Sequence, residues 1–341
     1  MEYDSKRIIR RTSNVNSLMI IIFYILDYTL IKMGGRIVYS LAEDSKYLYD
    51  IAELVSYCIQ YLIVVPLVIY IFKLISGNKE GMKISAGFRK PSMPTSWIAR
   101  WIIIAVGLSY AANYISTFLF SAIQSSIETE FKGVDLVSSG TSLGAFTSVL
   151  AMTVLAPFFE ELMFRGTLFR NTEKCGQWTG VIMIGLTFGL WHGSYQQILY
   201  AAVMGACACL MFAKTGSIIP GLILHVFINS IGAIQSVCLG QLDLNALNKA
   251  LETEDLTYMT EHMGVITVIV SFSLLTFALM IAGIVLFCRE IKFHKDSFSL
   301  INFCPDIPQK KKLWIYLTSP VTIIAFAGLI AMTVMTAIGV I

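Results

Sequence analysis

Residues 156–169, APFFEELMFRGTLF, place two adjacent carboxylates and one arginine in an otherwise apolar stretch. Charges buried in lipid cost several kcal/mol, so such residues usually face the interior of a helix bundle and serve a function. Glu161 and Arg165 are four residues apart and can form an ion pair along one helix face. Glu160 is rotated by about 100° from Glu161, so the two carboxylates are not expected to share one partner. The spacing predicts that Arg165 neutralises Glu161 and leaves Glu160 free for chemistry.

Two further apolar segments contribute histidines. His192 ends the segment FGLWH, and His225 precedes Asn229 by four residues in HVFIN, so these two side chains share a helix face. At 1.5 Å per residue, Glu160, His192 and His225 lie about 18, 21 and 13 Å from the expected cytoplasmic ends of their helices. We expect the three groups to meet at a similar depth. Peptide hydrolysis needs such a set: a base, an activated water and donors aimed at the developing oxyanion.

Each of these groups also has a structural interpretation. A Glu–Arg pair can fix the packing of helices, and a buried histidine is more often hydrogen-bonded than catalytic. His225 and Asn229 can join two helices through hydrogen bonds. A packing role, however, does not require Glu, His and His/Asn on three different segments.

In order and spacing, the three segments resemble the motifs of the CAAX protease and bacteriocin-processing family of intramembrane metalloproteases, which includes the type II CAAX prenyl endopeptidases. EELMFR fits EExxxR, FGLWH fits FxxxH and HVFIN fits HxxxN, within about residues 145–235. The resemblance implies an intramembrane endopeptidase in which Glu160 activates the hydrolytic water and His192 helps to hold it.

The same resemblance implies roles for the other motif residues. His225 and Asn229 would stabilise the tetrahedral oxyanion, and Glu161 with Arg165 would be the supporting pair. The substrate would be a peptide or a membrane protein, and membrane lipid and accessory membrane proteins are the other expected partners.

The metal requirement of such a site stays open. Glu160, His192 and His225 could hold Zn²⁺ or another divalent metal with a water in the fourth position. The chain has no HExxH pair. A glutamate-activated water without metal accounts for the same residues.

The composition predicts an all-α, polytopic membrane helix bundle. Of the 341 residues, 56% are hydrophobic and 14% are charged, whereas soluble domains carry about 25% charged residues. The net charge of +3 is scattered along the chain and gives no electrostatic footprint for nucleic acid. The seven cysteines lie mostly in apolar runs without metal-site spacing, which indicates small apolar fillers.

The pattern of hydropathy predicts eight or nine transmembrane helices, because the fifth and sixth apolar segments are separated only by residues 193–195. The segments are at about 16–40, 50–76, 97–123, 144–168, 177–193, 195–213, 217–238, 262–288 and 312–340. Basic and acidic loops alternate between them, which places the N-terminus in the cytoplasm. We divide the chain into N-terminal helices (1–143), core helices with the three motifs (144–238) and C-terminal helices (239–341).

Several charged features are expected to be structural. Asp27, Lys32 and Arg36 of the first segment are expected to pair internally or approach the inner membrane surface. The loop 77–96 is expected to be a connector at the inner leaflet. Compact loops and the lack of an organellar signal favour a multi-pass protein of a bacterial plasma membrane.

Two other classes of function remain open. A non-enzymatic bacteriocin-immunity or membrane scaffold protein would use the polar cluster to bind a partner. An ion-coupled transporter would use Glu160 and the histidines as a relay, although the sequence shows no internal repeat. A membrane di-iron oxidase is poorly supported, because the chain lacks the Glu-x-x-His pairs that such sites use.

Overall fold

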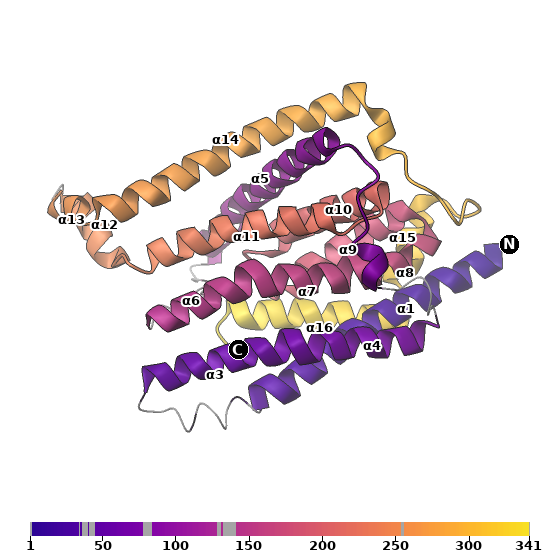
Figure 1. The fold of residues 1–341 in the computed structure, drawn as a ribbon, viewed down its shortest axis with the longest axis horizontal. Helices are drawn as coiled ribbons and strands as arrows, with labels where there is room; N and C mark the ends of the chain where they lie inside the picture. Colours follow the sequence, from indigo (N-terminus) through magenta and orange to yellow (C-terminus); the bar gives the residue numbers. More distant parts are fainter. Residues whose placement is uncertain are drawn as a thin grey trace.

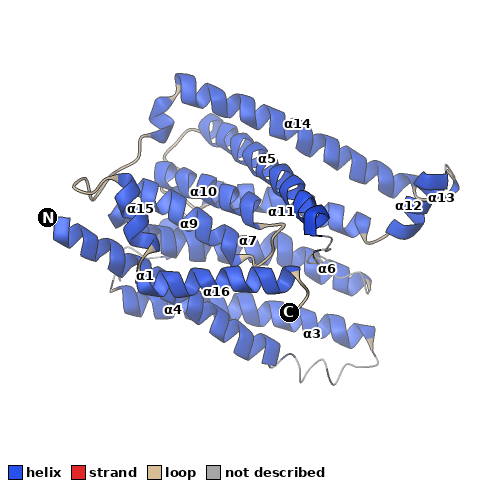
Figure 2. Cartoon of the chain, turned by 180° about the vertical axis from the view of Figure 1, so that it is seen from behind, coloured by secondary structure: helices blue, strands red, loops and turns tan. Residues whose placement is uncertain are grey.

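The computed structural model describes residues 2–33, 35, 40, 45–77, 84–127, 131, 141–253 and 256–340. Throughout these ranges the regular structure is helical and no strand occurs (Figure 2). Eight helical stretches are long and apolar enough to cross a membrane: Glu2–Ile31, Lys46–Ser76, Thr95–Ile127, Ser142–Cys175, Ile198–Thr215, Ile219–Leu239, Met263–Phe293 and Pro320–Ala337. The predicted polytopic helix bundle is confirmed, and the protein is a multi-pass membrane protein.

The central helices of the bundle are those that carry the three motifs. In Figure 1, α5 and α14 run along one edge, α1, α3 and α4 run along the opposite edge, and α7, α9, α10 and α11 lie between them. The helices are α1 (Glu2–Asp27), α3 (Lys46–Ile59), α4 (Val65–Ser76), α5 (Thr95–Ile127), α6 (Ser142–Leu150), α7 (Ala156–Met163), α8 (Arg170–Thr172), α9 (Gln177–Trp191), α10 (Ile198–Thr215), α11 (Ile219–Leu239), α12 (Leu244–Thr253), α13 (Thr257–Glu261), α14 (Met263–Phe293), α15 (Gln309–Leu317) and α16 (Pro320–Ala337).

The fifth predicted segment is the helix α9, which is shorter than the others. Its 15 residues measure about 22 Å at 1.5 Å per residue, less than the hydrocarbon thickness of about 30 Å. Glycines bring it unusually close to α10, because a Cβ on Gly189 would lie 2.3 Å from the carbonyl oxygen of Ile198. The chain therefore turns back inside the bundle, and His192 lies at this turn.

The fourth membrane span changes its helical pitch around the two glutamates. Residues 151–155 and 164–169 form wider π-helical turns on either side of α7. Pro157 is the second residue of α7, and proline has no N–H and crowds the preceding turn. A similar π-helical stretch, residues 60–64, precedes Pro66 in α4. Proline thus accompanies the widened turn in both spans, and such turns are common at functional sites.

A buried polar face of α1 joins the two ends of the sequence to the fourth span. Asn16 donates from Nδ2 to the Thr172 hydroxyl at 2.7 Å and to the Tyr316 hydroxyl at 3.0 Å. Asn171 in turn donates to Asn16 Oδ1 at 2.7 Å. These amide hydrogen bonds fix α1 against both the span that carries Glu160 and the helix α15.

Two regions add to the predictions: the last predicted segment and the loop 77–96. The last predicted segment, 312–340, is not one helix, because the chain breaks between α15 and α16 at Thr318 and Ser319. The described end of the loop 77–96 is clamped across the turn between α10 and α11, where Arg89 donates to the Gly216 carbonyl at 2.6 Å.

Some expectations fall outside the described residues. These are the positions 36, 43–44, 79, 83, 128–130, 135 and 254–255, which include Arg36 and several of the charges used for the topology. The side chain of Lys32 also lies outside them.

The long helices α5 and α14 touch through a pair of glycines. A Cβ on Gly107 would lie 2.6 Å from the Leu279 carbonyl oxygen and 2.7 Å from the Gly283 Cα. Small residues at such contacts let the backbones of membrane helices approach closely.

Gly107→Ala is expected to destabilise the protein by about 1–3 kcal/mol, because the added methyl group overpacks a backbone contact. The matched control is Gly264→Ala in α14, where nothing lies within 4 Å of an added Cβ. Thermal unfolding of the detergent-purified proteins measures both. Equal melting temperatures for Gly107→Ala and wild type would contradict the contact.

Candidate functional site

A fully buried ion pair lies at the centre of the motif residues. Arg165 Nη1 is 2.8 Å from Glu161 Oε1, and both side chains have an exposed fraction of 0%. Arg165 Nη2 also donates to the Gly205 carbonyl of α10 at 3.2 Å. Its guanidinium lies over the Phe188 ring of α9, 4.6 Å from the centroid. The predicted pair along one helix face is present, and it also contacts two other helices.

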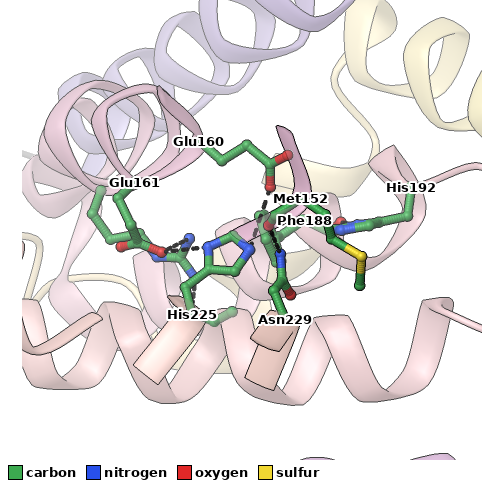
Figure 3. Close-up of polar contacts among 9 residues, drawn as sticks. Met152, Glu160, Glu161, Phe188, His192, His225 and Asn229 are labelled. Carbon is green, nitrogen blue, oxygen red and sulfur yellow. Dashed lines mark hydrogen bonds and ion pairs between the residues drawn. The ribbon is translucent and has the colours of Figure 1, made fainter. Parts of the chain in front are cut away.

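One imidazole lies between the two glutamates. His225 of α11 has Nδ1 3.2 Å from Glu161 Oε1 and Nε2 3.7 Å from Glu160 Oε2 (Figure 3). A carboxylate is only an acceptor, so Nδ1 carries the hydrogen in this contact. Glu161 therefore has two partners, Arg165 and His225. The prediction that the two carboxylates share no partner is wrong, because the two ring nitrogens of His225 face one glutamate each. The Oε2 of Glu160 makes no hydrogen bond to any described residue.

Asn229 donates a hydrogen bond to the Met152 backbone carbonyl, which has no donor within its own helix. In the π-helical turn before α7, the N–H of Ala156 bonds to the Ala151 carbonyl five residues back. The corresponding donor for the Met152 carbonyl would be Pro157, which has no N–H. Asn229 Nδ2 supplies the missing bond at 2.8 Å. This bond uses one of the two amide hydrogens of Asn229 and ties α11 to the fourth span.

His192 lies beside the glutamate cluster, separated from His225 by an aromatic ring. Its Nδ1 is 2.7 Å from the Phe188 carbonyl oxygen. Because a carbonyl accepts only, Nδ1 is the donor and Nε2 is unprotonated in the neutral ring. The Phe188 ring meets both imidazoles edge to face, at 4.8 Å from His192 and 5.6 Å from His225. No direct hydrogen bond joins His192 to Glu160 in the part of the chain that is described.

The structure thus brings together four of the six motif residues. Direct contacts join Glu160, Glu161, Arg165 and His225. The other two, His192 and Asn229, lie beside this group, half-buried, and each hydrogen-bonds to a backbone carbonyl.

The expected zinc ligands do not form a three-residue metal site in this arrangement. A catalytic zinc is held by three protein ligands. Within the described residues, no three His, Cys, Asp or Glu side chains are placed to hold a metal ion. Glu160 and His225 face each other, but His192 is not grouped with them.

The site also contains residues that the motifs did not indicate. A Cβ on Gly221 would lie 2.7 Å from Glu161 Oε2, so only glycine leaves room for this carboxylate. Gly221 precedes His225 by four residues, and this spacing was an available signal. Tyr24, Tyr61 and Tyr200 lie within electrostatic range of Glu160. The three tyrosines come from distant segments and gave no signal in the sequence.

Gly221→Ala is expected to displace the Glu161 carboxylate and to lower stability by about 1–3 kcal/mol through overpacking. The second substitution Glu161→Asp shortens the side chain and should recover part of the loss. Gly166→Ala is the control, because its nearest neighbours are 3.9 Å away. Thermal unfolding of wild type, Gly221→Ala, Gly221→Ala/Glu161→Asp and Gly166→Ala measures these effects. Equal melting temperatures for Gly221→Ala and Gly166→Ala would contradict the close contact.

Arg165→Met is expected to cost about 3–5 kcal/mol, because it leaves a buried carboxylate without its cation. The double variant Arg165→Met/Glu161→Gln removes both charges and should be more stable than Arg165→Met. Denaturant unfolding in detergent measures the difference. A double variant that is no more stable than the single one would show that the pair is not the main electrostatic constraint here.

The comparisons with known proteins agree with the motif segments. Residues 142–231 match the family model described as type II CAAX prenyl endopeptidase Rce1-like. No curated protein and no solved structure matches the chain. The matched residues cover about a quarter of the chain, from the start of α6 into α11, and contain all six motif residues. Through this segment the chain is related to the CAAX protease and bacteriocin-processing family, a family of intramembrane proteases.

Proposed function

We propose that the protein is an intramembrane endopeptidase that hydrolyses a peptide bond of a membrane-associated peptide or protein, with Glu160 as the base that activates water. One observation carries the proposal: of the two buried carboxylates, Glu161 is paired with Arg165 at 2.8 Å, whereas Glu160 Oε2 only faces His225 Nε2 at 3.7 Å, which is too long for a hydrogen bond. A buried carboxylate without a close cation is costly. A role in proton transfer accounts for its retention.

In the proposed reaction, Glu160 takes a proton from a water molecule as the water oxygen forms a bond to the substrate carbonyl carbon. The carbonyl oxygen becomes an oxyanion. Glu160 then gives the proton to the leaving nitrogen as the C–N bond breaks. His192 is suited to orient the water, because its Nδ1 is held by the Phe188 carbonyl and its Nε2 remains an acceptor.

His225 and Asn229 are the proposed donors to the oxyanion. Asn229 retains one amide hydrogen after its bond to Met152. His225 donates from Nε2 when it carries both protons, since Nδ1 already faces Glu161. In that state the charges of His225 and Arg165 balance those of both glutamates. When Glu160 accepts a proton, the cluster gains one positive charge, which stabilises the negative oxyanion.

The substrate belongs to the same proposal. A site within a helix bundle favours leader or signalling peptides and membrane-bound regulators as substrates. The compact loops fit a location in a bacterial plasma membrane.

Glu160→Gln is expected to lower cleavage by about 10²–10⁴-fold, the usual contribution of a general base. The measurement uses purified protein, a library of membrane peptides and mass spectrometry in ¹⁸O-water, where one ¹⁸O should enter each new carboxyl terminus. Glu173→Gln is the matched control, because Glu173 lies at the end of the same span, where its carboxylate accepts from Gln177 Nε2.

Adding a chelator distinguishes hydrolysis by a glutamate-activated water from hydrolysis that needs a metal ion. Cleavage that persists in chelator supports the glutamate-activated water, whereas loss in chelator with recovery in Zn²⁺ would assign the reaction to a metal. A well-folded wild type that cleaves nothing across a broad library would contradict the protease and favour a binding or immunity role. Glu160-dependent ion flux in proteoliposomes would favour a transporter.

A further inference from the structure

The helix α9 ends in a turn whose backbone carbonyls are all satisfied, and His192 belongs to this turn. The last four carbonyls of a helix have no partner within it. The Phe188 carbonyl accepts from the His192 ring at 2.7 Å, and the Gly189 carbonyl lies 3.4 Å from the His192 backbone nitrogen. The Leu190 carbonyl accepts from the Gly193 N–H at 3.2 Å. These three bonds are local to the turn.

The fourth carbonyl, that of Trp191, accepts its bond from a different helix. The donor is the hydroxyl of Tyr24 in α1. The preceding residue of α1, Phe23, packs its ring 5.2 Å from the Trp191 ring. The Trp191 ring in turn lies 5.7 Å from the His192 imidazole. Two adjacent α1 residues therefore contact the end of α9, Tyr24 through its hydroxyl and Phe23 through its ring.

An apolar groove lies beside this turn. It has a volume of about 430 Å³ and runs between α1 and α16, and Tyr24 and Met332 are among its lining residues. Gly193, with φ +61°, closes the turn, and a Cβ there would lie 2.9 Å from Met332 Cε. The groove lining is almost entirely apolar, so the hydrogen bond from Tyr24 adds a directional contact to apolar ones.

We propose that Tyr24 is a positioning residue for hydrolysis, which fixes His192 by donating a hydrogen bond to the Trp191 carbonyl. The inference rests on the proposed function only for its effect on catalysis. Tyr24 lies outside the segment 142–231 that matches the family model. Through it, the first helix of the chain controls the geometry of a water-binding group, and small displacements of such groups have large effects on rate.

Tyr24→Phe tests the inference, because it removes only the hydroxyl. The matched control is Tyr28→Phe, one turn further along the chain, which lines the same groove but is 52% exposed. The protein has four histidines, so ¹⁵N-histidine labelling in detergent micelles gives few ring signals. A His192→Gln variant assigns those of His192. Tyr24→Phe should move the His192 signals and leave those of His262 and His294, whereas Tyr28→Phe should move none.

Kinetics supply the second readout. Tyr24→Phe is expected to lower kcat by about 10–100-fold, as for a misplaced catalytic group, with KM changed less than about twofold. Placing 4-aminophenylalanine at position 24 restores a donor and should restore most of kcat. Unchanged His192 signals in Tyr24→Phe, or a loss of kcat that the amino group does not restore, would overturn the inference.

The two proposals fail in different ways. If wild type cleaves no peptide but Tyr24→Phe moves the His192 signals, the positioning contact stands and the protease does not. If wild type cleaves and the His192 signals stay unchanged in Tyr24→Phe, the protease stands and the positioning role does not.

Discussion

The buried ion pair between Arg165 and Glu161 is the constraint on which the rest of the site depends. Two adjacent carboxylates inside a bilayer are tolerated only if their charge is balanced by groups that are already in place. The same guanidinium contacts the Gly205 carbonyl of α10 and the ring of Phe188 in α9, and Glu161 reaches α11 through His225. One charge pair therefore fixes the relative positions of the fourth span, α9, α10 and α11. The position of Glu160 follows from that arrangement.

The widened turns of the fourth span supply the second part of this arrangement. A regular α-helix would satisfy nearly all its own carbonyls and offer nothing to a neighbouring helix. Pro157 and the π-helical turn before it leave the Met152 carbonyl for Asn229. A local defect in one helix thus becomes a directional bond between two helices. The position of α11, and with it the distance from His225 to Glu160, is set by backbone chemistry as well as by charge.

The spacing of residues predicted contacts within one helix, but it did not predict contacts between helices. The pair Glu161–Arg165, the shared face of His225 and Asn229 and the all-α bundle follow from residues three or four apart and from hydropathy. The position of His225 between both glutamates depends on the distance between α7 and α11, which no single segment encodes. The hydrogen bond from Tyr24 to Trp191 joins residues 167 positions apart, and neither residue type indicates a partner. The catalytic roles of the motif residues stay predictions.

The polar face of α1 has a consequence for how the molecule is assembled. Asn16 finds its partners 156 and 300 residues later in the chain, at Thr172 and Tyr316. During synthesis the Asn16 amide therefore lacks one of its hydrogen-bond partners until α15 has been translated. The bonds of α1 to Thr172 and Trp191 need only the first 191 residues, whereas its bond to Tyr316 must form later. The contact between α1 and α15 is thus among the later ones to form as the bundle assembles.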